Sequence, residues 1–236
     1  MINLNIVAEG STEETFVNNV LKGYFAPMGI YVYTRKILTG WNKTRGKPAK
    51  GGFLKYSMFK NDVNRWIEND RNKHNTYYTS LVDLYGFPKD IHSPYIEDIQ
   101  KITDPYNKVE KLEEAIGRDI NHPRFIPYVQ LHEFEVFLLC EPHRLIQMYP
   151  DRTSGVEKLI QEIGGMNPEE INEKPTTSPS KRVIKYVPEY EGQKAQVGPL
   201  VAEDIGLDKL RECCKHFNNW ISKIENLIKE STPKSP

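Results

Sequence analysis

Acidic side chains stand where three β-prone stretches of this 236-residue chain end. Glu9 follows the first stretch, and Asp83 lies at the end of the second. Glu133 and Glu135 follow the third. Carboxylates, together with water, are the ligands that Mg²⁺ and Mn²⁺ prefer. If the three ends meet at one edge of a sheet, they predict a Mg²⁺ or Mn²⁺ site formed by Glu9, Asp83 and one of the two later glutamates.

The first of these ends is a turn from strand to helix. Gly10 lets the backbone reverse at little steric cost, and Ser11 with Glu14 fits a capping box. Glu13 falls in the first helical turn, where it either favours the helix dipole or takes part in chemistry. Glu9 has no capping role, so a metal or substrate role is the better interpretation for it.

The third end also carries a histidine. Apolar residues at helical spacing predict a helix over 131–138, which would place His132 and Glu135 on one face. Cys140 and His143 complete no familiar zinc spacing, and carboxylates outnumber soft ligands, so magnesium or manganese fits better than zinc. A lone histidine is more often a hydrogen-bonding core residue than a metal ligand.

A long basic segment runs from Arg35 to Lys60 with eight cations and no acid. Its glycine-rich centre predicts a loop, and phosphates are the obvious partner of such a local excess of positive charge. A solvated surface loop, or a loop that binds an acidic protein, is also consistent with the pattern. The residues assigned to DNA or RNA binding are Lys43, Arg45, Lys47, Lys50 and Lys55.

A second basic pair, Lys181 and Arg182, follows Ser178 and Ser180 at a predicted helix start. A helix amino terminus beside two cations suits a phosphate, so either cation is a candidate to stabilise charge on it. A plain N-cap with two exposed basic residues accounts for the same pattern.

Strands and helices must alternate to position these residues. The periodicity predicts strands over 2–7, 30–38, 76–85 and 125–131, with helices over 11–21, 54–70, 94–121 and 208–229. Pro105 divides the third helix, and Pro127 gives the last strand an edge position. The acids of 94–121, Glu113 among them, are assigned to solvated faces, and 186–197 is predicted to be a polar loop. We expect one α/β domain over 1–236, with a core of about 1–140 and a helical extension over about 141–230.

The totals restrict the class of protein. The chain has 32 basic and 32 acidic residues and a net charge of zero, so it is not a globally basic nucleic-acid binder. Cys140, Cys213 and Cys214 are odd in number and lack paired C-x-x-C spacing, which argues against a disulfide framework or a structural zinc site. No apolar run approaches the roughly 20 residues of a membrane span. We expect a cytoplasmic protein, with Cys213 and Cys214 packed in the core.

Five short motifs together resemble one known family, and the resemblance spans nearly the whole chain. The motifs begin at Glu9-Gly10-Ser11, Asp83-Leu84-Tyr85-Gly86, Leu131-His132-Glu133, Ser178-Pro179-Ser180 and Ile205-Gly206-Leu207. They are similar to the domain-of-unknown-function family numbered 4276 of bacteria and archaea, which in turn resembles Toprim domains. The resemblance implies a Toprim-like, Rossmannoid α/β fold with a mostly parallel sheet of about four strands. It also implies one or two magnesium ions.

The resemblance assigns individual residues of this chain to positions of the Toprim motif. Glu9 takes the place of the Toprim glutamate, and Glu13 resembles the second acid found in the overcoming-lysogenisation-defect nucleases. Asp83 takes the first position of the Asp-x-Asp pair. Tyr85 stands where the second acid would be, so Glu133 or Glu135 must replace that ligand.

These residues favour a magnesium-dependent phosphodiester hydrolase that acts on nucleic acid. Glu13 would hold a second metal or act as a general base. The resemblance also implies a phage-defence or mobile-element setting with an ATPase partner. One alternative is a non-catalytic nucleic-acid or nucleotide-binding subunit with a degenerate metal site, and another is a structural subunit that docks through the basic segment.

Overall fold

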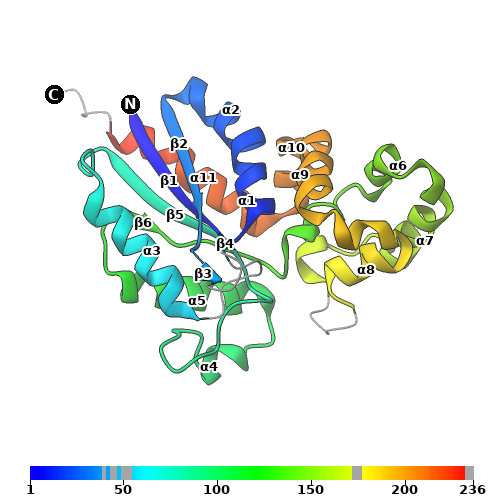
Figure 1. Ribbon diagram of the computed structural model, residues 1–236, viewed down its shortest axis with the longest axis horizontal. Helices are drawn as coiled ribbons and strands as arrows, with labels where there is room; N and C mark the ends of the chain where they lie inside the picture. Colours follow the sequence, from blue (N-terminus) through cyan, green and yellow to red (C-terminus); the bar gives the residue numbers. More distant parts are fainter. Residues whose placement is uncertain (39–40, 43–46, 49–54, 172–176, 232–236) are drawn as a thin grey trace.

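A parallel sheet forms the centre of the molecule (Figure 1), in a computed structural model that describes residues 1–38, 41–42, 47–48, 55–171 and 177–231. The strand order is β2-β1-β5-β6, with β7 beside β5, and each of these pairs is parallel. Their bounds are β1 Ile2–Ala8, β2 Ile30–Lys36, β5 Thr76–Asp83, β6 Phe125–Ile126 and β7 Val129–Gln130. The carboxyl ends of the strands therefore share one edge of the sheet. The predicted α/β fold with about four strands is confirmed.

Proline accounts for the form of the fourth strand. It was predicted as one run over 125–131, but it forms two short strands, β6 and β7, separated by Pro127 and Tyr128. Pro127 has no amide hydrogen to donate to the neighbouring strand. The Ser80 hydroxyl instead donates to the Tyr128 carbonyl across the gap, at 2.8 Å.

One face of the sheet is covered by α3 (Tyr56–Asn69) and α5 (Pro105–Ile120) (Figure 1). Their apolar stripes pack on the strand residues Val7 and Val82. A short helix, α4 (Glu97–Gln100), precedes α5, so Pro105 divides the predicted helix as expected. Pro105 is the first residue of α5, where a missing amide costs least.

The other face is covered by a helix from the amino-terminal half and one from the carboxyl terminus. After the β1 turn come α1 (Ser11–Phe16), a π-helical turn η1 (Val17–Leu21), α2 (Lys22–Phe25) and a 3-10 turn η2 (Ala26–Met28). They share one core with α11 (Lys215–Ser231), in which the Phe16 ring stacks on Phe137 with centroids 5.3 Å apart.

Short helices make up most of the chain after residue 131, and α6, α7 and α8 lie to one side of the sheet (Figure 1). Two predictions are wrong here: 186–197 is not a polar loop but η7 and the first turn of α9, and the predicted final helix is divided at Cys214. The elements are η3 Phe134–Val136, η4 Pro142–Arg144, α6 Leu145–Met148, η5 Pro150–Arg152, α7 Thr153–Ile163, η6 Pro168–Glu170, α8 Pro179–Tyr186, η7 Pro188–Gly192, α9 Lys194–Ile205 and α10 Leu207–Cys213.

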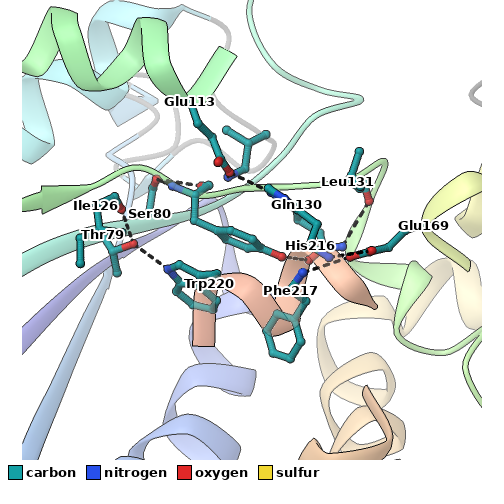
Figure 2. Close-up of polar contacts among 12 residues, drawn as sticks. Thr79, Ser80, Glu113, Ile126, Gln130, Leu131, Glu169, His216, Phe217 and Trp220 are labelled. Carbon is teal, nitrogen blue, oxygen red and sulfur yellow. Dashed lines mark hydrogen bonds and ion pairs between the residues drawn. The ribbon is translucent and has the colours of Figure 1, made fainter. Parts of the chain in front are cut away.

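A buried polar network attaches α11 to the sheet (Figure 2). His216 Nε2 lies 2.9 Å from Glu113 Oε1, which also accepts the Val129 amide at 2.8 Å. The Glu169 carboxylate accepts the amides of His216 and Phe217, in the first turn of α11. The prediction that Glu113 is solvated is therefore wrong. Its side chain is buried because its partners come from distant segments that periodicity does not identify.

The basic segment lies partly within the described residues. A two-stranded antiparallel pair, β3 (Trp41–Asn42) and β4 (Lys47–Pro48), stands within the predicted loop. Lys43, Arg45 and Lys50 lie outside the described residues. Among the residues that are described, no helix is long and apolar enough to cross a membrane.

Candidate functional site

Five carboxylates gather at the carboxyl edge of the sheet, and we call them the acidic cluster: Glu9, Glu13, Asp83, Glu133 and Glu135. Glu9, Asp83 and Glu133 stand at or just after the ends of β1, β5 and β7, whereas Glu13 lies in α1 and Glu135 in η3. The Asp83 amide donates to Glu9 Oε2 at 2.8 Å, which joins the first two strand ends. The Phe134 amide lies 3.3 Å from Asp83 Oδ2 and brings in the third. The site lies where the chain leaves β1 and β5 in opposite directions, the position at which open α/β sheets bind ligands.

Glu13, and not Glu14, supplies the capping carboxylate of the first helix. Gly10 is the N-cap residue, and its amide donates to Glu13 Oε2 at 2.8 Å. The predicted capping box of Ser11 and Glu14 is therefore wrong, because the helix begins one residue earlier than expected. Glu14 forms an ion pair with Lys36 at 3.2 Å instead.

Asp83 has the least satisfied carboxylate of the cluster. Its Oδ1 atom is buried and has no hydrogen-bond partner among the described residues. Gly86 follows close by: a Cβ built on it would lie 3.6 Å from Glu9 Oε1, so the turn after β5 passes next to the first acid. Tyr85, at the place of the second Toprim aspartate, is exposed.

Burial and mutual repulsion raise the pKa values of Glu9, Glu13 and Asp83. Burial, with a smaller contribution from Glu9, raises the pKa of Glu13 to about 8. Burial also raises the pKa of Glu9, against the stabilising Asp83 amide, and that of Asp83, where Glu9 adds to the effect. Ionised carboxylates so close together need a proton or a cation beside them. The cluster is therefore suited to bind positive charge.

A hydrogen bond joins the Glu133 carboxylate to the backbone at the start of α8. The Ser180 amide donates to Glu133 Oε2 at 2.9 Å, so a carboxylate of the protein already occupies the helix start that was predicted to suit a phosphate. Lys181 lies 3.8 Å from Glu191, and Arg182 forms an ion pair with Glu162 at 2.6 Å. Neither cation contacts the acidic cluster, so their predicted catalytic role finds no support in these contacts.

Glu135 forms an ion pair with Lys194, a residue that the sequence pattern did not predict to be part of the site. Lys194 Nζ lies 3.2 Å from Glu135 Oε1, and the Tyr190 hydroxyl donates to the same oxygen at 3.3 Å. Both residues fall in the segment predicted to be a loop. Val197 and Val201, four residues apart, carried a helical signal there, but Gly198 and Pro199 obscured it.

His132 does not share a face with Glu135. The predicted helix over 131–138 is wrong, because His132 adopts a left-handed conformation with φ of 61° and only a 3-10 turn follows. Its Nε2 lies 2.9 Å from the Glu169 carbonyl, and its own carbonyl accepts the Tyr85 amide at 2.9 Å. These bonds hold a strained backbone in place. His132 is thus a buried positioning residue beside Glu133.

The described cations of the basic segment are partly engaged. Lys36 pairs with Glu14, Lys60 with Asp119 at 2.8 Å, and Arg35 stacks over Trp66. Lys55 is exposed before the first residue of α3, and Lys47 lies in β4. Of the predicted nucleic-acid ligands, these two alone belong to the described part of the chain.

The donor set of the cluster fits magnesium in type, although its side chains do not form a finished coordination shell. Within the described residues, no group of three or more His, Cys, Asp or Glu is arranged so that it could hold a metal ion. Glu9, Asp83 and Glu133 each accept a backbone amide through one oxygen. Their second oxygens are the ligands such an ion would take, after side-chain rotation.

The parallel sheet, its two helical layers and the acids at its carboxyl edge define an α/β protein with a strand-end acidic site. The chain matches the sequence model of the family described as Domain of unknown function (DUF4276) over residues 8–225, and it belongs to that family. The resemblance seen in the sequence is confirmed at this level, and the further likeness to Toprim domains stays a prediction. No curated protein and no solved structure matches the chain.

Proposed function

We propose that the protein is a magnesium- or manganese-dependent phosphodiester hydrolase that acts on nucleic acid. The observation that carries the proposal is the acidic cluster, in which Asp83 Oδ1 is buried without a hydrogen-bond partner among the described residues. Glu9, Glu13 and Asp83 are costly for stability alone, since burial and repulsion oppose the ionisation of their carboxylates. A divalent cation removes that cost.

Glu9, Asp83 and Glu133 are the residues that would hold the ion. Glu133 is preferred to Glu135 as the third ligand because Glu135 is already paired with Lys194. When bound, Mg²⁺ would polarise the phosphoryl group and lower the pKa of an attacking water. Glu13, anchored to the Gly10 amide, stands beside these ligands as a second-metal ligand or a general base.

Lys194 is the cation best placed to bind a phosphate oxygen. Its ammonium group contacts the acidic cluster, and its side chain remains 35% exposed, so it can reach both the cluster and a bound substrate. Lys181 and Arg182 are engaged with Glu191 and Glu162. We therefore assign to Lys194 the charge-stabilising role first predicted for that pair.

The nucleic-acid substrate and the partner are supported by sequence alone. The excess of cations between Arg35 and Lys60 is the argument for a phosphate backbone as substrate. The ATPase partner and the phage-defence setting are expectations that come from the family resemblance.

Cleavage assays test the proposal directly. Purified protein is incubated with single- and double-stranded DNA and RNA, with Mg²⁺, Mn²⁺ or a chelator. We expect cleavage that depends on the metal and that falls at least about 100-fold in Glu9→Gln and Asp83→Asn. Glu14→Gln is the control, because Glu14 follows Glu13 directly in α1 but pairs with Lys36, outside the cluster. Cleavage that is equal in Asp83→Asn and wild type would refute the proposal.

A non-catalytic binding subunit is the second candidate, and two observations favour it. Tyr85 replaces an acid of the Toprim pair, and the described side chains form no ready coordination shell. Such a subunit would bind nucleic acid in a salt-dependent manner without cleaving it. Calorimetry separates the two candidates, since only the hydrolase requires Mg²⁺ binding that Asp83→Asn abolishes.

A further inference from the structure

The three cysteines, far apart in the sequence, converge at one place in the fold. Cys140 ends the series of turns that begins at Phe134, and Cys213 and Cys214 lie at the junction of α10 and α11. The sulfur atoms of Cys140 and Cys214 are 3.5 Å apart. All three thiols are reduced in the structure.

Solvent has access to one side of this cluster. Cys140 and Cys213 are partly buried and line a cavity of about 480 Å³, together with Leu139 and Met166. Cys214 lies behind them and is fully buried. A small oxidant can therefore reach Cys140 but not Cys214.

The thiols of Cys140 and Cys214 are in contact. The Cys140 sulfur lies 3.7 Å from the Val136 carbonyl and 3.5 Å from the Cys214 sulfur, and either thiol can be the donor in the second contact. A disulfide bond requires the sulfurs to approach to about 2.05 Å. The 3.5 Å contact between the two sulfurs must therefore shorten by side-chain rotation for the bond to form.

We propose that Cys140 and Cys214 form a disulfide bond when the protein meets a peroxide, and that Cys140 is the thiol oxidised first. Cys140 sulfur attacks one peroxide oxygen, the O–O bond breaks, and a sulfenic acid and one water form. Cys214 sulfur then attacks the sulfenic sulfur: the S–S bond forms, the S–O bond breaks, and the hydroxide leaves with the thiol proton as a second water. Two thiols lose two electrons and two protons, and the peroxide is reduced to water.

This bond would fasten the acidic cluster to the carboxyl-terminal helices. Cys140 is linked to Glu135 through successive 3-10 hydrogen bonds, including Leu138 to Glu135 and Cys140 to Phe137. Cys214 is the residue from which α11 starts. Oxidation would therefore limit movement of the segment that carries Glu133 and Glu135. The inference does not depend on the proposed hydrolase activity.

Thiol counting and peptide mapping test the inference. The reduced full-length protein is treated with hydrogen peroxide at low protein concentration, and free thiols are titrated in denaturant. We expect three free thiols to fall to one, a cross-linked peptide pair containing Cys140 and Cys214, and full recovery with dithiothreitol. Against a hydrogen bond from Cys213, the Cys214 contact and burial raise the pKa of the Cys140 thiol, and burial raises that of Cys214, so little thiolate is present and the reaction should take minutes to hours. Thermal unfolding of the oxidised protein should shift upward by roughly 5 to 15 °C.

Alanine variants identify the partners. Cys213→Ala should still lose both remaining thiols, whereas Cys140→Ala and Cys214→Ala should form no intramolecular disulfide. Circular dichroism confirms that each variant folds, and the wild-type mapping stands even if one does not. Three thiols that persist in peroxide, a stable sulfinic acid at Cys140, or a bond from Cys213 to either neighbour would overturn the inference.

Discussion

At the scale of the residue, Asp83 lowers the stability of the metal-free protein and is suited to bind a cation. It is the acid with a buried oxygen that no described residue satisfies, and Glu9 and Glu13 both repel its negative charge. A side chain of this kind costs stability in the metal-free protein and recovers it only when a cation is present.

This gives a prediction for Asp83→Asn in the absence of metal. The amide removes a buried like charge, so we expect the midpoint of thermal unfolding at pH 8 to rise by about 2 to 4 °C, equivalent to about 1 kcal/mol. The same variant should lose the stabilisation that Mg²⁺ gives to the wild type. Differential scanning calorimetry with and without Mg²⁺ measures both effects, and a variant less stable than wild type without metal would contradict the prediction.

Lys194 is a second residue with a separable role. Lys194→Met removes the ammonium group but keeps much of the aliphatic packing, so we expect kcat for cleavage to fall about 100- to 1000-fold with the fold retained. Lys181→Met is the matched control, since Lys181 is an exposed partner of Glu191, and it should change kcat less than about 2-fold. Equal losses of kcat in the two variants would contradict a specific role for Lys194.

The candidate site could be predicted from the sequence only in part, and the reason lies in these side chains. Glu9 and Asp83 follow apolar strands, which makes their position visible in the local pattern. Lys194 reaches the cluster from α9, about 60 residues beyond Glu135, and no local pattern records such a contact. The family resemblance predicted the acidic residues of the site but not Lys194.

At the scale of the element, α11 depends on groups outside itself. Its first turn has two amides that are satisfied by Glu169, a buried carboxylate from η6. The residue directly before α11 is Cys214, the C-cap residue of α10, and its thiol contacts Cys140. Tertiary structure therefore supplies the cap.

Removal of this cap should be expensive. Glu169→Ala leaves two buried amides unsatisfied, and we expect the free energy of unfolding to fall by about 2 to 4 kcal/mol in urea denaturation. Glu170→Ala is the control, because Glu170 is its exposed neighbour, and it should change the value by less than about 0.5 kcal/mol. A loss of similar size in both variants would show that the contact has another origin.

The elements were predicted with unequal success. The strands β1, β2 and β5 and the helices α3 and α5 carry strong apolar periods, and each was predicted to within about two residues of its ends, apart from the start of α5, which Pro105 set. The segment over 131–138 has a helical period as well, yet the left-handed backbone at His132 overrides it. Local pattern cannot anticipate a conformation that distant hydrogen bonds hold.

The whole molecule should respond to pH in a direction that its acids determine. The pKa of Glu13 is raised from 4.5 to about 8 in the folded protein, so a proton binds the folded state more tightly. This contribution to stability is complete below about pH 4.5 and is lost as the pH rises through about 8. Burial also raises the pKa of Glu9 and Asp83, and they act in the same direction.

We therefore expect the metal-free protein to unfold about 5 to 10 °C lower at pH 8.5 than at pH 6. Below about pH 4.5 the trend reverses, because hydrogen bonds from Lys185 and Tyr186 lower the pKa of Glu162, and that stabilisation is lost on protonation. Mg²⁺ should stabilise the protein more at pH 8.5 than at pH 6. Thermal scans across this range measure the effect, and a flat profile between pH 6 and pH 8.5 would contradict it.

β1 and α11 share one hydrophobic core although they are far apart in the sequence, and this affects folding during translation. The first strand leaves the ribosome about 200 residues before the helix that covers one of its faces. At synthesis rates of about 5 to 20 residues per second, α11 is synthesised roughly 10 to 40 s after β1. The apolar core that β1 shares with α11 is therefore incomplete during translation, and truncation before Lys215 would leave part of that core uncovered.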